Sequence, residues 1–279
     1  MEKITLENVS KFMGYLTEEE KSPSTIQKYQ RDILAFMDWA KDRYIDKGLV
    51  IKYKEYLLGN YAPASVNSVL SSLNSFFEYT GEHKLKVKML KIQKSVFLDK
   101  SKELTRGEYT RLLETASLRK NKRLYYIMQT LCSTGIRISE LKYITRETVT
   151  EGRSTIRSKG KLRTVILPDR LCKMLKMYAE KNNIKSGSIF VTRNGNPIDR
   201  SNIWSDMKKL CKSAGVSEDK VFPHNLRHLF ARTFYSVQKD IARLADILGH
   251  TSINTTRIYT METGEIHKRQ IQELGLLLC

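Results

Sequence analysis

The chain has 279 residues, of which 41% are hydrophobic and 28% are charged, and its formal net charge is +19. This composition predicts a soluble protein that folds, with room for two domains of ordinary size. No apolar stretch approaches the length that crosses a bilayer, and the first residues lack the pattern of a signal peptide, so we expect a cytoplasmic protein without a membrane partner.

The positive charge is unevenly distributed along the chain. Residues 1–100 carry an excess of 3 positive charges, and residues 101–279 carry an excess of 16. An excess of this size indicates a polyanionic partner, because cationic groups that bind phosphates release condensed counterions. The alternative is a protein that is merely basic. The four cysteines lie too far apart in sequence for a zinc or redox motif, so we expect no metal site and no disulfide.

Residues 1–82 are predicted to form a small helical domain. A serine followed by proline typically begins a helix, and glycine often ends one. With apolar residues at helical spacing, these signals predict helices at 6–16, from Ser22-Pro23 to Ala40, at 52–58, and from Pro63 to Gly81. Four aromatic residues are expected in the core rather than on a base-stacking surface: Phe36, Trp39, Phe76 and Phe77.

Residues 83–103 are predicted to be a basic linker. Lysines alternate there with apolar residues, without a helical period: Lys84, Lys86, Lys88, Lys91 and Lys94. One hypothesis is that these lysines lie along DNA phosphates, and the other is that the segment is a solvated connector.

Residues 104–279 are predicted to form a second, mixed α/β domain. Thr105 and Glu108 have the spacing of a capping box, and a buried helix is expected at 123–131. Two strand-like runs, 154–157 and 164–167, flank Lys159-Gly160-Lys161 and predict a β-hairpin. Helices are then expected at 171–180, 203–211, 225–236, 240–248 and 254–259, with an amphipathic tail over 266–279. The fold class is therefore mainly α with a small β-hairpin.

A spaced set of basic residues precedes one tyrosine in this second domain. The set is Arg137, Lys159, His224, Arg227 and His250, and the tyrosine is Tyr259. Each residue alone has an ordinary structural explanation, such as a helix cap or a core residue. Together they match a site for a phosphodiester and a hydroxyl nucleophile.

The chemistry of a phosphodiester explains these residue types. Attack by a hydroxyl forms a phosphorane with extra charge on its non-bridging oxygens, which planar and permanently charged guanidinium groups such as Arg137 and Arg227 stabilise. The leaving 5′-oxygen needs a proton, for which Lys159 on the hairpin turn is placed. The phenol of Tyr259 needs a proton acceptor, for which we expect His224, while His250 hydrogen-bonds the phosphate.

These motifs make the chain resemble the tyrosine recombinase (phage integrase) family, in particular its short two-domain Xer-like members. The matching segments are Thr134 to Leu141, Lys159-Gly160, His224 to Arg227, and Leu248-Gly249-His250 with Tyr259 nine residues later. The resemblance implies a SAM-like core-binding domain in front of a catalytic domain. All six catalytic positions match, so an active enzyme is expected.

The resemblance also implies a reaction and partners. The family's two-domain members close around double-stranded DNA, and four protomers pair two recombination sites. A 3′-phosphotyrosyl link and a Holliday junction follow, with no metal or other cofactor. The tail at about 266–279 would dock into a neighbouring protomer, with packing on its own protomer as the alternative. Accessory DNA-bending or directionality proteins are possible partners.

Several alternatives stay open at the level of sequence. Lys161 and Arg163 share the hairpin with Lys159 and are candidate DNA contacts. Any of these three cations could donate the proton, although Lys159 is the position that matches the motif. Glu140 either orients Arg137 or pairs at the surface. The chain is alternatively a non-catalytic DNA-binding regulator, with a helix-turn-helix over 240–260, or a type IB topoisomerase-like enzyme. Integration and excision of a mobile element cannot be separated from chromosome or plasmid resolution, and the DNA target is not visible.

Overall fold

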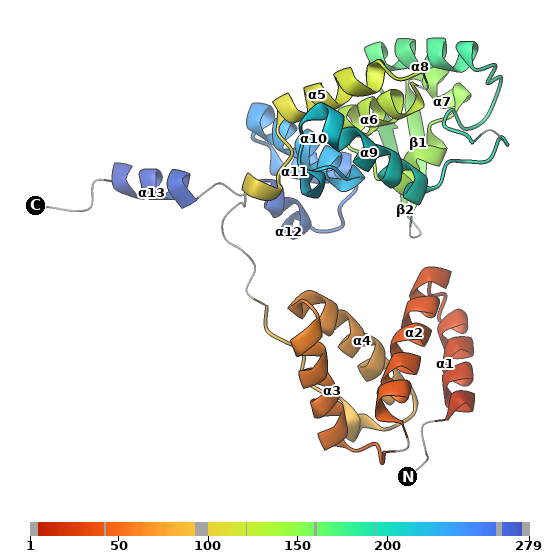
Figure 1. Ribbon diagram of the computed structural model, residues 1–279, viewed down its shortest axis with the longest axis vertical. Helices are drawn as coiled ribbons and strands as arrows, with labels where there is room; N and C mark the ends of the chain where they lie inside the picture. Colours follow the sequence, from red (N-terminus) through yellow and green to blue (C-terminus); the bar gives the residue numbers. More distant parts are fainter. Residues whose placement is uncertain are drawn as a thin grey trace, which may run out of the picture. The chain divides into compact units, whose positions relative to one another are not determined.

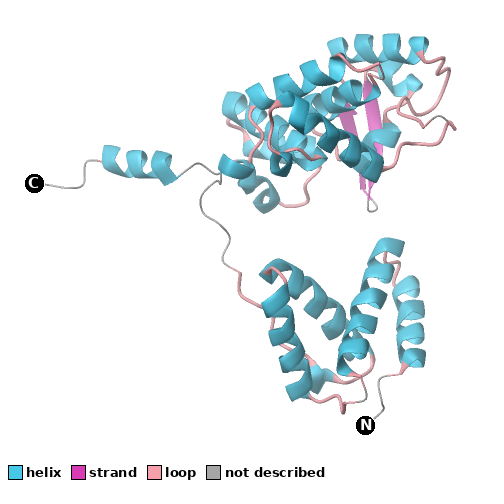
Figure 2. Ribbon diagram, in the orientation of Figure 1, coloured by secondary structure: helices cyan, strands magenta, loops and turns pink. Residues whose placement is uncertain are grey.

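The computed structural model describes residues 5–41, 43–92, 100–120, 122–158, 161–192, 194–260 and 264–274. The chain divides into two compact units, 1–94 and 95–279 (Figure 1). Helices predominate in both units, and the strands form a single hairpin within the described residues of the second unit (Figure 2). The predicted fold class is confirmed.

The first unit is built from four helices: α1 (Leu6–Glu18), α2 (Pro23–Ala40), α3 (Lys47–Asn60) and α4 (Pro63–Tyr79). The side chains of Thr5, Ser22 and Asp46 cap the first three by accepting a backbone N–H. Phe36, Phe76 and Phe77 are fully buried in the shared core, as predicted, and Trp39 packs at its edge against Tyr53.

The segment 83–90 packs on the first unit, although it falls in the expected linker. Leu85 and Val87 are buried against the helical core, and Asn74 of α4 forms two hydrogen bonds with the backbone of Val87. Asn67 does the same at Leu90: its side-chain amide donates to the carbonyl of Leu90 and accepts from its N–H. The segment begins with the 3₁₀ turn His83–Leu85, and Leu85, Val87 and Leu90 are the residues that it packs on the core, while Met89 stays exposed. The intervening Lys84, Lys86 and Lys88 are exposed.

The second unit contains most of the helices and the hairpin. Its elements are α5 (Arg106–Ser117), α6 (Arg123–Thr134), α7 (Arg146–Glu151), β1 (Arg153–Ser158), β2 (Lys161–Ile166), α8 (Asp169–Lys181), α9 (Arg200–Ala214), α10 (Pro223–Gln238), α11 (Ile241–Leu248), α12 (Ile253–Thr256) and α13 (Gly264–Glu273). The predicted capping box of Thr105 and Glu108 begins α5. The short helix α7 was not predicted.

The hairpin and the central helices position the candidate site. The strands β1 and β2 pair antiparallel with Ser158 opposite Lys161, and Ile156 and Val165 bury one face of the hairpin. Helix α6 packs against α10, and α10 continues through a short turn into α11 (Figure 1). Of the helices in the described parts of the chain, none is long and apolar enough to span a bilayer.

Candidate active site

The first arginine motif lies where α6 ends. Gly135 ends the helix with φ +64°, a conformation that favours glycine. A Cβ atom at Gly135 would lie 2.4 Å from Cδ1 of Phe230 on α10, so the end of α6 can approach α10 closely only without a side chain. This approach brings the carbonyl of Gly135 to within 2.6 Å of Nη1 of Arg227.

Arg227 lies on α10 with only 1% of its surface exposed. Besides the bond to Gly135, its Nη2 atom donates to the carbonyl of Leu248 at 2.8 Å, while its Nε is buried without a hydrogen-bond partner. Burial, and next the positive charge of Arg137, lower the pKa of Arg227 to about 10, so it stays charged at neutral pH. The two carbonyls compensate part of the unfavourable free energy of burying this charge.

His250 lies beside Arg227, just after the glycine that ends α11. Its Nε2 is 3.0 Å from Nη2 of Arg227, and its Nδ1 is 2.8 Å from Oγ1 of the buried Thr256. A guanidinium can only donate, so Nε2 accepts and Nδ1 carries the proton. Burial and the charges of Arg227 and Arg137 lower the pKa of His250 to about 4. The imidazole is therefore neutral near pH 7.

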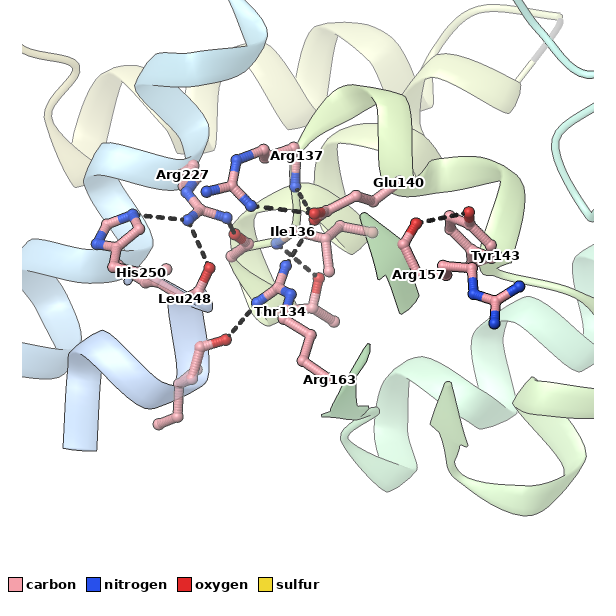
Figure 3. Close-up of polar contacts among 12 residues, drawn as sticks. Thr134, Ile136, Arg137, Glu140, Tyr143, Arg157, Arg163, Arg227, Leu248 and His250 are labelled. Atoms are coloured by element: carbon pink, nitrogen blue, oxygen red, sulfur yellow. Dashed lines mark hydrogen bonds and ion pairs between the residues drawn. The ribbon is translucent and has the colours of Figure 1, made fainter. Parts of the chain in front are cut away.

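Glu140 joins two arginines beneath this site (Figure 3). Its carboxylate is 2% exposed and accepts from the backbone N–H of Arg137 at 2.7 Å and from Nη1 of the same residue at 3.1 Å. Its Oε2 also accepts from Nη2 of Arg163 at 2.6 Å. Of the two sequence hypotheses for Glu140, orientation of Arg137 is the one that the structure supports. Arg137 itself keeps 38% of its side chain exposed.

Tyr259 ends the 3₁₀ turn Arg257–Tyr259 that follows α12, and it is 4% exposed. It packs with Leu244 and Leu248 of α11 and Ala231 of α10. Its ring stacks 6.2 Å from the ring of His250 and meets the ring of His228 edge-on at 5.1 Å.

His224 begins α10 on the exposed side of the same cluster. Its ring is 4.6 Å from that of His228, which in turn contacts Tyr259. Desolvation, followed by the charges of His228, Arg227 and Arg137, lowers the pKa of His224 to about 4. His224 is thus neutral at physiological pH and able to accept a proton.

His228 was not singled out from the sequence. It lies one helical turn after His224, its Nδ1 is 3.7 Å from Oε1 of Glu103, and its Nε2 is buried without a hydrogen-bond partner. Glu103 also pairs with Arg232 at 2.6 Å. The spacing of four residues from His224 on a predicted helix places both histidines on one face, and that signal was present in the sequence.

The structure thus gathers Arg137, His224, Arg227, His250 and Tyr259 around one location. Lys159 and Lys94 lie outside the described residues, as does the side chain of Lys161. Lys84, Lys86, Lys88 and Lys91 are exposed, whereas Arg163, an expected DNA contact, is turned inward. Within the described ranges, no group of histidine, cysteine and acidic side chains is arranged to hold a metal ion.

Comparison with known proteins decides the family. Residues 102–265 match the model of the phage integrase family. The chain belongs to this family. Residues 9–84 also match the phage integrase N-terminal SAM-like domain, so both parts of the tyrosine recombinase resemblance are confirmed.

Curated tyrosine recombinases match nearly the whole chain. The tyrosine recombinase XerA of Thermococcus kodakarensis is 31% identical, and the match covers 98% of this chain and 96% of that one. The tyrosine recombinase XerD of Staphylococcus aureus is 28% identical over 92% of each chain. This phage integrase family member is therefore a tyrosine recombinase by sequence.

Solved structures agree in fold. A crystal structure of XerA recombinase, 28% identical, covers 98% of this chain and 99% of that chain, with a TM-score of 0.53. XerH site-specific recombinase bound to its difH substrate in a pre-cleavage complex is 20% identical, with a TM-score of 0.71 over 93% of this chain and 83% of that chain. At that identity, the second likeness concerns the fold alone.

Proposed function

We propose that this tyrosine recombinase cuts and rejoins double-stranded DNA at paired specific sites, with Tyr259 as the nucleophile. The observation that carries the proposal is the cluster itself. Two neutral histidines and two cationic arginines lie close together, and a buried tyrosine stacks on one of the histidines, His250. A phosphodiester is the substrate that this combination of charge and nucleophile fits.

The roles follow from the contacts. Arg137, partly exposed and held by Glu140, donates to the non-bridging oxygens of the phosphate. Most N–H groups of Arg227 already donate to Gly135, Leu248 and His250. Arg227 therefore acts on these oxygens through its positive charge rather than through hydrogen bonds. Such fixed donors each stabilise a transition state by roughly 2–4 kcal/mol.

Cleavage and rejoining use the same groups in opposite directions. The oxygen of Tyr259 forms a bond to phosphorus, its proton passes to His224, and the bond from phosphorus to the 5′-oxygen breaks as Lys159 protonates that oxygen. A 5′-hydroxyl from the partner duplex then attacks the 3′-phosphotyrosine and gives its proton to Lys159, while the bond from phosphorus to Tyr259 breaks and His224 returns the proton to the phenol oxygen. The exchange gives a Holliday junction. The proposal requires no metal or other cofactor.

Access to the nucleophile is part of the proposal. The side chain of Tyr259 is 4% exposed, so a phosphate cannot line up with its hydroxyl unless the turn Arg257–Tyr259 shifts. That turn and α12 together are only seven residues long. We propose that DNA binding moves this short segment and uncovers the hydroxyl.

Assembly and cellular role extend the same proposal. Four protomers on two sites, with the tail from about 266 exchanged between them, would cover Ile271 and Leu274, which are 66% and 63% exposed. Leu277 and Leu278 lie outside the described residues.

The exposed lysines of 83–92 supply phosphate contacts in this proposal. The protein acts in the cytoplasm, either in the movement of a mobile element or in chromosome or plasmid resolution.

Covalent capture tests the proposal. Wild-type protein, Tyr259→Phe and the control Tyr235→Phe are mixed with nicked duplexes from the DNA that flanks the gene, and are run on denaturing gels. Tyr235 packs in the same cluster, so its variant controls for the loss of a phenol hydroxyl near the site. An adduct with wild type and Tyr235→Phe, but not with Tyr259→Phe, supports the recombinase.

The alternatives give different outcomes. Tight binding with no adduct would favour the DNA-binding regulator. Efficient relaxation of plasmids that lack a defined site would favour the topoisomerase-like enzyme.

A further inference from the structure

The inward-facing arginine of the hairpin, Arg163, has a place in the site that phosphate binding does not explain. It lies on β2, and only 14% of its side chain is exposed. Its neighbour on the other strand is Ile156, a core residue, so this part of the hairpin lies against the body of the unit.

The guanidinium of Arg163 connects two catalytic motifs. Nη2 donates to Oε2 of Glu140 at 2.6 Å, and Nη1 donates to the carbonyl of Ile247 at the end of α11. The first contact reaches Arg137, because Glu140 holds that arginine by its backbone and its guanidinium. Figure 3 shows Arg163 between Glu140 on one side and the end of α11 on the other.

The second contact reaches the other half of the site. The residue after Ile247 is Leu248, whose carbonyl accepts from Arg227, and two residues further is His250. The side chain of Arg163 therefore fixes the distance between Glu140, which holds Arg137, and the end of α11, which holds Arg227 and leads to His250.

The glycine of the Leu-Gly-His motif makes room for this connection. A Cβ atom at Gly249 would lie 2.4 Å from Cδ and 2.9 Å from Nε of Arg163. Distances below 3.0 Å are not tolerated between such atoms, so any side chain at Gly249 would displace the arginine.

We propose that Arg163 is a positioning residue that holds the two catalytic arginines, Arg137 and Arg227, at the spacing the transition state needs. The inference rests on the proposed function. Displacement of a catalytic group by about 1 Å can slow a reaction by about 100-fold. Loss of Arg163 should therefore reduce the rate of cleavage much more than the affinity for DNA.

The test compares Arg163→Gln and Arg163→Lys with a matched control, Arg157→Gln. Arg157 lies on β1 of the same hairpin with an exposed side chain, so its variant removes the same charge. Adduct formation is followed in single turnover at saturating nicked duplex, and DNA affinity and thermal unfolding are measured on the same proteins. We expect cleavage about 100-fold slower for Arg163→Gln and near wild-type rates for Arg157→Gln.

A second substrate separates positioning from general loss of structure. A methylphosphonate at the scissile position lacks one negative oxygen, so it needs less neutralisation by the two arginines. If Arg163 acts through them, the defect of Arg163→Gln shrinks by about tenfold or more on this substrate. A merely unstable protein would be equally impaired on both substrates.

The outcomes are distinguishable. Wild-type cleavage rates for Arg163→Gln, or the same defect on both substrates, would overturn the positioning role. Absence of an adduct with wild-type protein would instead count against the proposed function, before Arg163 is considered.

Discussion

Nε2 of His250 lies 3.0 Å from Nη2 of Arg227, and this contact sets the protonation state of the histidine. An imidazole nitrogen can accept from a guanidinium only when the ring is neutral, and burial opposes charging of the ring as well. The imidazole therefore keeps its proton on Nδ1, directed at Thr256. Before any proton transfer, Arg137 and Arg227 carry positive charge in the cluster, while His224 and His250, whose pKa values are lowered, are neutral.

The lowered pKa values of His224 and His250 predict that the folded state loses stability in mild acid. Both values are about 4 in the folded protein, against 6.5 for an ordinary histidine. Between these values the unfolded chain binds more protons, so the free energy of unfolding falls as the pH decreases from about 6.5 towards 4. Urea titrations at pH 7.5, 6 and 5 check this.

The double variant His224→Gln/His250→Gln is the control for that effect. Its stability should depend less on pH in the same window than that of wild type. Equal pH dependence in both proteins would contradict the assignment.

Substitution of Gly249 should destabilise the protein more than substitution of a glycine with similar φ in open space. Gly152 has φ +74° with no atom near the position of a Cβ, so Gly152→Ala should cost about 1 kcal/mol from backbone strain. Gly249→Ala adds the overlap with Arg163 and should cost about 3 kcal/mol. Chemical denaturation measures both.

A double variant tests whether the overlap with Arg163 causes the loss of stability. Gly249→Ala combined with Arg163→Ala removes the overlap, so the two changes should be clearly non-additive. Additive losses would show that the close approach is unimportant.

Replacement of Glu140 by glutamine should weaken both folding and cleavage. The carboxylate is 2% exposed between Arg137 and Arg163, and its loss leaves two guanidinium groups facing a neutral amide. We expect a loss of about 3 kcal/mol in the free energy of unfolding, together with slower adduct formation. Glu151→Gln, an exposed carboxylate on α7, should change neither quantity. A Glu140→Gln protein as stable as wild type would contradict the assigned contacts.

His228 should matter through its ring. It contacts Tyr259 edge-on at 5.1 Å, and an aromatic pair of this kind contributes about 1 kcal/mol. His228→Gln should therefore slow adduct formation by roughly tenfold at most, whereas His228→Phe, which keeps a ring, should retain more activity. Single-turnover rates at saturating DNA give the comparison, with His83→Gln in the first unit as control. If the glutamine variant outperforms the phenylalanine variant, the ring contact is not what matters.

Much of the fold was visible in the sequence because its signals are local. Ser22 with Pro23 begins α2, and Thr105 with Glu108 begins α5, as predicted. Helix α7 was missed because six residues are too few to display a period. The segment 83–90 has no helical period, so the sequence predicts a linker there. Its packing on the first unit depends on Asn67 and Asn74 of α4, which bond its backbone, and such tertiary contacts are not visible in the sequence.

The candidate site divides in the same way. The motifs could be found because each is a short string, and the i, i+4 relationship of His224 and His228 was equally readable. The partnership of Glu140 with Arg163 was not, because it joins residues 23 positions apart whose approach depends on how the hairpin packs. Charge alone suggested a phosphate contact for Arg163, and only burial reveals its internal partners.

The clearance between Gly249 and Arg163 has a consequence for how these sequences can diverge. A side chain at position 249 destabilises the fold less after position 163 has become smaller, so that order of substitution is favoured. Relatives with any residue other than glycine at 249 should lack arginine at 163. The converse need not hold, because φ +65° still favours glycine after the arginine is gone. The two positions should therefore covary in one direction only.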